Sequence, residues 1–150
     1  MKTLQEGDKV PNFTVNDQEG NPVSLMDYKG HKLVVFFYPK ANTPGCTKEA
    51  CNLRDNYKEL KNKGYKLLGV SADSERKQKN FKEKYDFPFT LLADENKEVI
   101  NAFGVWGPKK FMGREYDGIH RMTFIVDEEG KVERVIAKVK TKDHAAQILE

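Results

Sequence analysis

The chain has 150 residues, a length that suits one domain with a full hydrophobic core and no need for disulfide cross-links. We therefore expect a single domain over residues 1–150. Its 26 Lys and Arg exceed its 23 Asp and Glu by too little, and are too dispersed, to indicate a nucleic-acid or anionic membrane partner.

The sequence shows no targeting or membrane-spanning segment. Residues 1–8 lack the apolar stretch of a signal peptide, and no apolar run approaches the ~18 residues of a membrane span. We therefore expect a cytosolic protein. A structural disulfide is disfavoured in that reducing compartment, so Cys46 and Cys51 are expected to be reactive, metal-binding or incidental.

The predicted elements alternate between strands and helices along the chain. Residues 13–16 and 22–25 flank a polar loop and predict a hairpin, and 33–38 predict a buried strand. A helix follows up to Gly64, with apolar residues at helical spacing. The other predictions are strand 65–71, a helix capped by Ser74, strand 90–94, helix 98–103, loop 104–110, hairpin 122–126 with 131–136, and a helix from Thr141 to Leu149.

This order of elements predicts an α/β fold. Strands that alternate with helical crossovers form a mixed central sheet with helices on its faces, which is a three-layer sandwich. The N-terminal hairpin precedes that sheet.

Cys46 occupies a distinctive corner between the buried strand and the following helix. The first turn of a helix presents unpaired N–H groups and the positive end of the helix dipole, and both favour a thiolate. Cys46 is therefore a candidate nucleophile. It lies four residues before Ala50 on the inward face of the helix, whereas Cys51 is rotated by roughly 140° and points outward.

The residues around this corner resemble a known family. Pro39, Thr43 and Cys46 reproduce the Pro-x-x-x-Thr-x-x-Cys pattern of peroxiredoxins, and the run TPGCTKEAC over residues 43–51 is similar to the PrxQ subfamily, also called bacterioferritin comigratory protein. The segment GIHRMTF over 118–124 resembles the one that carries the family's active-site arginine, here Arg121. The resemblance covers essentially the whole chain.

The resemblance implies a thioredoxin-like fold and a peroxidase that reduces hydrogen peroxide or organic hydroperoxides. It implies that Cys46 is the peroxidatic cysteine and Cys51 the resolving cysteine of an intramolecular disulfide, with Pro39, Thr43 and Arg121 completing the site. Recycling would come from thioredoxin or a similar dithiol. The subfamily suggests a monomer that needs no metal, haem or flavin.

Elementary chemistry supports these roles. The permanent charge and fixed donors of Arg121 suit both the thiolate and the oxygen that leaves the peroxide. Pro39 is expected to shield the sulfenic acid. We also expect Glu49 to act near the helix start and at the substrate site, and Trp106, with Phe111, to line the substrate entrance.

Three other readings remain open. Cys46 could serve a hydrolase with His120 or His31 as its base, although no partner that would orient the base is recognisable. The two cysteines and three histidines could form a metal site, but their spacing is not typical of one. The third reading is a redox sensor without turnover. A thioredoxin-type reductase is not indicated, because Cys-x-x-Cys is absent.

The spacing of the two cysteines makes a separate prediction. Five residues along an intact helix place two Cα atoms about 8.7 Å apart, whereas a disulfide needs less than about 7 Å. A bond between Cys46 and Cys51 would therefore require the first helical turn to unwind. Pro44 and Gly45 weaken that end of the helix.

Overall fold

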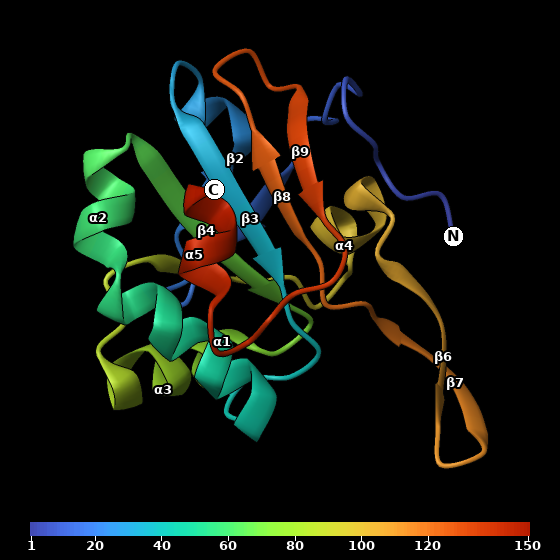
Figure 1. The fold of residues 1–150 in the computed structure, drawn as a ribbon. Coiled ribbons are helices and arrows are strands. Elements are labelled where there is room, and N and C mark those ends of the chain that lie inside the picture. Colours follow the sequence, from blue (N-terminus) through green and yellow to red (C-terminus); the bar gives the residue numbers. More distant parts are fainter.

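A computed structural model describes residues 1–150, and its centre is a five-stranded sheet (Figure 1). Its strands are β3 (Lys32–Phe37), β4 (Tyr65–Ser71), β5 (Thr90–Ala93), β8 (Thr123–Val126) and β9 (Val132–Ile136). They lie in the order β5-β4-β3-β8-β9. β3, β4 and β5 are parallel, β8 is antiparallel to β3, and β9 is antiparallel to β8. The predicted mixed sheet is confirmed.

Helices cover both faces of this sheet (Figure 1). They are α1 (Pro44–Asp55), α2 (Tyr57–Asn62), α3 (Glu75–Tyr85), α4 (Glu98–Phe103) and α5 (His144–Leu149). Side chains of α1, α2, α3 and α5 share one core cluster, and those of α4 belong to the other. The predicted three-layer sandwich is therefore confirmed. None of the helices combines the length and the apolar character needed to cross a bilayer.

The central strand β3 supplies both cores, because alternate side chains of a strand point to opposite faces of its sheet. Val34 and Phe36 belong to the cluster beneath α1, α2, α3 and α5. Val35 and Phe37 belong to the cluster beneath α4. All four side chains are fully buried. The carboxyl end of β3, where the cysteine-bearing segment begins, is thus held from both sides.

An N-terminal hairpin packs against the α4 side of the sheet. Strands β1 (Thr14–Asn16) and β2 (Pro22–Ser24) pair antiparallel, with Val15 opposite Val23, and a short 3₁₀ helix, η1 (Leu25–Tyr28), follows. Both valines contact the α4-side core. The predicted hairpin is confirmed.

The helix expected up to Gly64 is two helices, so the expectation of one continuous helix was wrong. α1 and α2 are separated by Asn56, which has φ −111° and ψ 15°. Its side-chain amide donates to the carbonyl of Asn52 at 2.9 Å, the same carbonyl that its backbone N–H reaches at 3.2 Å. This local competition of an asparagine side chain with the helix explains the break. The apolar spacing continues across it, because both helices face the same core.

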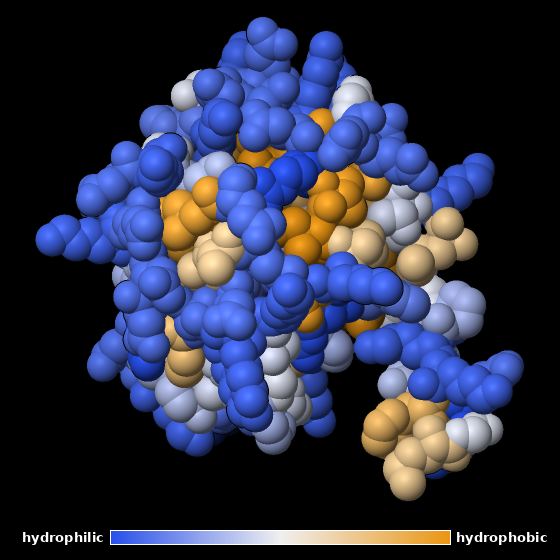
Figure 2. Space-filling model, viewed as in Figure 1, coloured by the Kyte–Doolittle hydropathy of each residue, from blue (hydrophilic) through white to orange (hydrophobic).

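The segment expected as a loop over 104–110 instead enters a second hairpin. Strands β6 (Trp106–Phe111) and β7 (Arg114–Ile119) pair antiparallel and project from the body of the protein (Figure 1). Met112 and Gly113 join them, with φ of 52° and 79°, as a two-residue hairpin turn with positive φ requires. Gly107 and Pro108 led to the prediction of a loop, because glycine and proline are usually found in loops or at sheet edges. Phe111 and Met112 form an exposed apolar tip (Figure 2).

The last helix starts later than expected. α5 begins at His144 with Asp143 as its N-cap residue, and not at Thr141. The N–H of Asp143 donates to the carbonyl of Lys140 at 3.0 Å, so a turn occupies the segment between them. This shift places a buried histidine at the first position of the helix.

Candidate active site

Cys46 is the third residue of α1, directly after the loop that leaves β3. Its side chain is only 2% exposed and belongs to the same core cluster as Ala50 and Leu53. The predicted inward orientation is confirmed. Cys51 is half-buried on the same helix, and both thiols are free.

The start of α1 leaves donors available beside the sulfur. Thr43 is the N-cap residue, but its side chain accepts no hydrogen bond from the helix and its hydroxyl donates to the carbonyl of Lys40 at 2.8 Å. Pro44 has no N–H, and the amides of Gly45 and Cys46 have no protein acceptor. These two amides and the helix dipole favour negative charge at the sulfur.

Arg121 reaches the sulfur from far along the chain. It lies just before β8. The carbonyl of the next residue, Met122, accepts a hydrogen bond from the backbone N–H of Phe37 at the end of β3, which ties this segment to the central strand. Nη2 of Arg121 donates to Sγ of Cys46 at 3.3 Å, and Nη1 donates to Oε1 of Glu49 at 2.7 Å. Burial opposes the charge of Arg121, but its interactions with Cys46 and Glu49 outweigh burial and raise the pKa of Arg121. One guanidinium therefore bridges the sulfur and the carboxyl group.

Gly45 leaves room for this guanidinium. A Cβ at position 45 would lie 3.2 Å from Nη2 of Arg121, which is tighter than ordinary packing. Close packing against Arg121 therefore explains why a residue without a side chain suits position 45.

Glu49 lies behind Arg121 and is fully buried. Burial raises the pKa of Glu49 to about 7, although the charge and hydrogen bond of Arg121 act in the opposite direction. Its second oxygen, Oε2, has no hydrogen-bond partner. The structure therefore places Glu49 in the interior of the protein, in contact with Arg121.

Other residues singled out from the sequence lie further from this centre. Pro39 is half-buried between β3 and α1, and Phe111 is exposed at the hairpin tip. Trp106 packs against the core on the α4 side of the sheet, with Nζ of Lys97 at 4.7 Å from its ring centre. The structure therefore unites Cys46, Arg121 and Glu49, and does not bring Trp106 to them.

Lys109 is a neighbour that sequence reasoning did not find. Its ammonium donates to the carbonyl of Ile119 at 2.8 Å. Burial lowers the pKa of Lys109, the charge of Arg121 lowers it further, and Cys46 opposes both. Lys109 was overlooked because its segment was read as a loop, and only the β6–β7 pairing folds it back toward Arg121.

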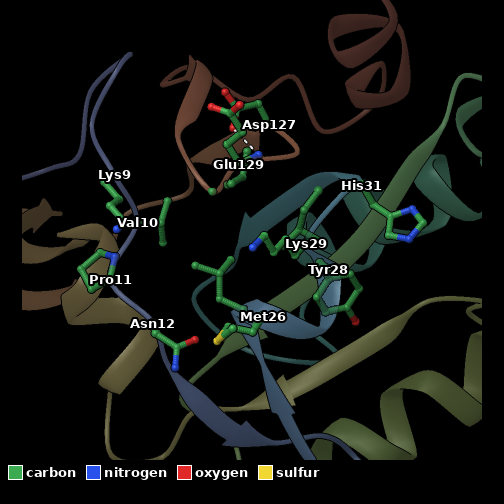
Figure 3. A pocket seen from close by; sticks show the side chains of 14 residues that line it. Lys9, Val10, Pro11, Asn12, Met26, Tyr28, Lys29, His31, Asp127 and Glu129 are labelled. Carbon is green, nitrogen blue, oxygen red and sulfur yellow. Dashed lines mark hydrogen bonds between the residues drawn. The ribbon is translucent and has the colours of Figure 1, made fainter.

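Neither histidine offered as a base makes a hydrogen bond with the sulfur, whose side-chain partner is Arg121. His31 lines a cavity of about 520 Å³ (Figure 3). His31 directly precedes β3, whereas Cys46 follows the other end of that strand. Nε2 of His120 contacts the carbonyl oxygen of Pro108 at 3.0 Å. No group of three His, Cys, Asp or Glu side chains is placed to hold a metal ion.

The fold and this centre together define a class of protein: a cysteine-dependent redox enzyme on an α/β sandwich. Its reactive sulfur begins a helix and contacts a guanidinium. No other side chain of the chain combines a free buried thiol with a cationic partner.

Comparison with known proteins makes the assignment specific. The AhpC/TSA family model matches residues 6–135. Peroxiredoxin Bcp of Escherichia coli K12 is 50% identical over 149 residues, 99% of this chain and 96% of that protein. Peroxiredoxin Bcp of Bacillus subtilis 168 is 45% identical over 148 residues, with coverage of 99% and 94%.

Solved structures agree with the sequence comparison. Peroxiredoxin Q of Xanthomonas campestris superimposes with a TM-score of 0.86 at 37% identity, over 91% of this chain and 87% of that one. A PrxQ variant of Xylella fastidiosa gives a TM-score of 0.92 at 28% identity, with coverage of 99% and 95%. The chain belongs to the AhpC/TSA family, as a peroxiredoxin of the PrxQ/Bcp type, and it is a thiol peroxidase with a thioredoxin-like fold.

Proposed function

We propose that Cys46 reduces alkyl hydroperoxides and hydrogen peroxide, that Cys51 resolves the oxidised sulfur, and that thioredoxin or a similar dithiol restores both thiols. The substrate class follows a relative: trapped intermediate and ligand complexes of the Xanthomonas campestris bacterioferritin comigratory protein concern its alkyl peroxide reduction activity. That protein is 36% identical and superimposes with a TM-score of 0.86, over 91% of this chain and 87% of that one.

The contact of Arg121 with Cys46, at 3.3 Å, is the observation that carries the proposal. The thiolate attacks one peroxide oxygen, an S–O bond forms, and the O–O bond breaks. The departing alkoxide takes a proton from solvent and leaves as an alcohol. The guanidinium and the unpaired amides at the start of α1 stabilise the charge that moves from sulfur to oxygen.

Thr43 and Pro39 complete the proposed substrate site. The Thr43 hydroxyl donates its proton to the carbonyl of Lys40. Its oxygen is therefore free to accept the hydrogen of a peroxide O–H, which orients the other oxygen toward the sulfur. Pro39 has no N–H and lies half-buried beside the loop, where it limits the access of water to the sulfenic acid.

Cys51 then attacks the Cys46 sulfenic acid, and a disulfide and water are formed. This step must precede reaction with a second peroxide, which would give the sulfinic acid. An external dithiol reduces the disulfide and is itself oxidised. In this scheme the enzyme acts as a monomer in a reducing compartment, the cytoplasm.

Peroxide consumption coupled to a thioredoxin system tests this scheme, with mass spectrometry of both cysteines. Cys46→Ser should abolish turnover. Cys51→Ser is the matched control: it should still form one sulfenic acid per chain, trapped by a sulfenic-specific reagent, but should lose thioredoxin-linked cycling. Normal turnover of Cys46→Ser would refute the scheme. A wild-type protein that oxidises once and never cycles would instead indicate a redox sensor.

A further inference from the structure

The active-site arginine is connected to the C-terminal helix through a buried pair, Glu49 on α1 and His144 on α5. Both side chains are fully buried. Oε1 of Glu49 accepts from Arg121, whereas Oε2 lies 3.6 Å from Nε2 of His144, too far for a hydrogen bond. Oε2 is the one buried side-chain oxygen or nitrogen without a partner.

Helix α5 is held firmly in this position against α1. The side chain of Asn52 on α1 accepts from the N–H of Ala145 at 2.8 Å and donates to the carbonyl of Lys142 at 2.8 Å. These two bonds bracket His144 in the sequence. The distance between Glu49 and His144 is therefore set by the packing of two helices and not by a mobile side chain.

The hydrogen bonds around His144 define which of its ring nitrogens carries a proton. Oε1 of Gln147 accepts from the backbone N–H of Lys140, and its Nε2 donates to the carbonyl of Lys138, each at 2.9 Å. The amide orientation of Gln147 is thus fixed. Nδ1 of His144, at 2.9 Å from Oε1 of Gln147, must be a donor.

His144 is neutral at ordinary pH in this environment. Burial lowers the pKa of His144 to about 4, the bond to Gln147 opposes this, and the charges of Arg121 and Arg134 on β9 lower it further. With its proton on Nδ1, the neutral ring has no hydrogen on Nε2, and the lone pair of that nitrogen is an acceptor. The hydroxyl of Thr123 donates to that nitrogen at 2.7 Å.

An ionised Glu49 would fit this arrangement poorly. Its Oε2 would be a buried anionic oxygen without a donor, 3.6 Å from a ring nitrogen that carries no hydrogen, and such a group is costly. The only opposite charge in contact is Arg121, which is already shared with Cys46. A proton on Oε2 removes this buried charge.

We propose that Glu49 carries a proton on Oε2, on the side that faces His144, in the reduced enzyme at neutral pH. Because the protonated Glu49 is uncharged, the positive charge of Arg121 then stabilises the sulfur of Cys46 without a competing carboxylate. His144 is a positioning residue here, because it acts through Glu49. The inference rests on the proposed role of Cys46 as the nucleophile. When the proton is lost in alkaline solution, the carboxylate competes with the thiolate for Arg121.

The pH dependence of the first oxidation step tests this proposal. Single-turnover rates with hydrogen peroxide should fall several-fold between neutral and alkaline solution. Glu49→Gln fixes an uncharged group of the same shape, so its alkaline fall should disappear. Asp55→Asn removes an exposed carboxylate from the same helix and is the matched control, which should keep the fall. A Glu49→Gln profile that keeps the wild-type alkaline fall would overturn the proposal.

A spectroscopic measurement separates this proposal from the peroxidase scheme. Infrared spectra of the wild type at about pH 6 should contain the band of a protonated buried carboxyl group that is absent from Glu49→Gln. Nitrogen NMR should show His144 neutral with its proton on Nδ1. Neither signal depends on peroxide. Absence of the Glu49 carboxyl band, or a doubly protonated His144, would overturn the proposal even if Cys46 reacts normally, whereas an unreactive Cys46 would overturn the proposed function alone.

Discussion

Formation of the disulfide between Cys46 and Cys51 should unwind the start of α1. Both cysteines lie within this 12-residue helix. In an intact helix their Cα atoms would be about 8.7 Å apart, beyond the limit of about 7 Å for a disulfide. Cys46 must also leave a site where it is 2% exposed. The helix cannot close this gap without losing its own hydrogen bonds.

The cost of unwinding can be estimated from the bonds involved. The first helical bond joins the N–H of Thr47 to the carbonyl of Thr43 at 2.8 Å, and about three more follow before Cys51. At roughly 0.5–1.5 kcal/mol each, their loss costs about 2–6 kcal/mol. Glu49 lies between the two cysteines, so its contact with Arg121 should break in the same step.

Hydrogen exchange compares the two redox states directly. Amides 47–51 should lose protection in the disulfide form, while those of α3, which carries no cysteine, should keep it. Helical circular dichroism should fall accordingly. Cys51→Ser oxidised once is the control, since its sulfenic acid should leave α1 intact. Unchanged protection of α1 in a proven intramolecular disulfide would refute this reasoning.

Three further substitutions test the site. Arg121→Lys cannot bridge Cys46 and Glu49 with one planar group, and stopped-flow rates with peroxide should fall on the order of 100-fold, the effect of removing one preorganised donor; an unchanged rate would contradict the bridging role. Gly45→Ala should displace the guanidinium by a few tenths of an ångström and slow the same reaction several-fold, with wild-type kinetics as the contrary result. Glu49→Gln should also change how the free energy of unfolding, measured in urea, depends on pH. In the wild type the raised pKa of Glu49, about 7, lowers stability as pH rises from about 4.5. The lowered pKa of His144, about 4, raises stability up to about pH 6.5. The two slopes nearly cancel; in Glu49→Gln only the second remains, so stability should increase by up to about 3 kcal/mol between about pH 4 and 6.5, and a flat profile would contradict this.

Local patterns in the sequence were sufficient for most of the fold. The apolar run that became β3, the spacing of Ala50 and Leu53, and the serine that caps α3 each encode their structure within a few residues. Ser74 accepts from the N–H of Lys77 at 3.2 Å, as a cap should. Such features are predictable because their physical causes are local.

The errors share a different cause. β6 and β7 are strands because they pair with each other, with Trp106 opposite Ile119 and the following residues in register. Asn56 breaks a helix whose apolar spacing continues unchanged. In both cases a pairing or a side-chain hydrogen bond outweighs the local pattern, and neither is visible in composition or periodicity.

The site divides in the same way. Cys46 and Thr43 could be placed from the strand-to-helix corner, whereas Arg121 was recognised through a family resemblance and not from its surroundings. His144 was considered only as a possible metal ligand. Its position facing Glu49 depends on the packing of α5 against α1 through Asn52, which joins segments about 90 residues apart.

Titration of Cys46 in the reduced protein tests the central claim most directly. Thiolate absorbance can be followed against pH in the wild type and in Cys46→Ser, with alkylation rates as a second reading. The account predicts that the Cys46-specific signal shows a thiolate at neutral pH, held by Arg121 and the start of α1, and that this thiolate is consumed by one equivalent of hydroperoxide. A fully protonated Cys46 at neutral pH that does not react with hydroperoxides would contradict it.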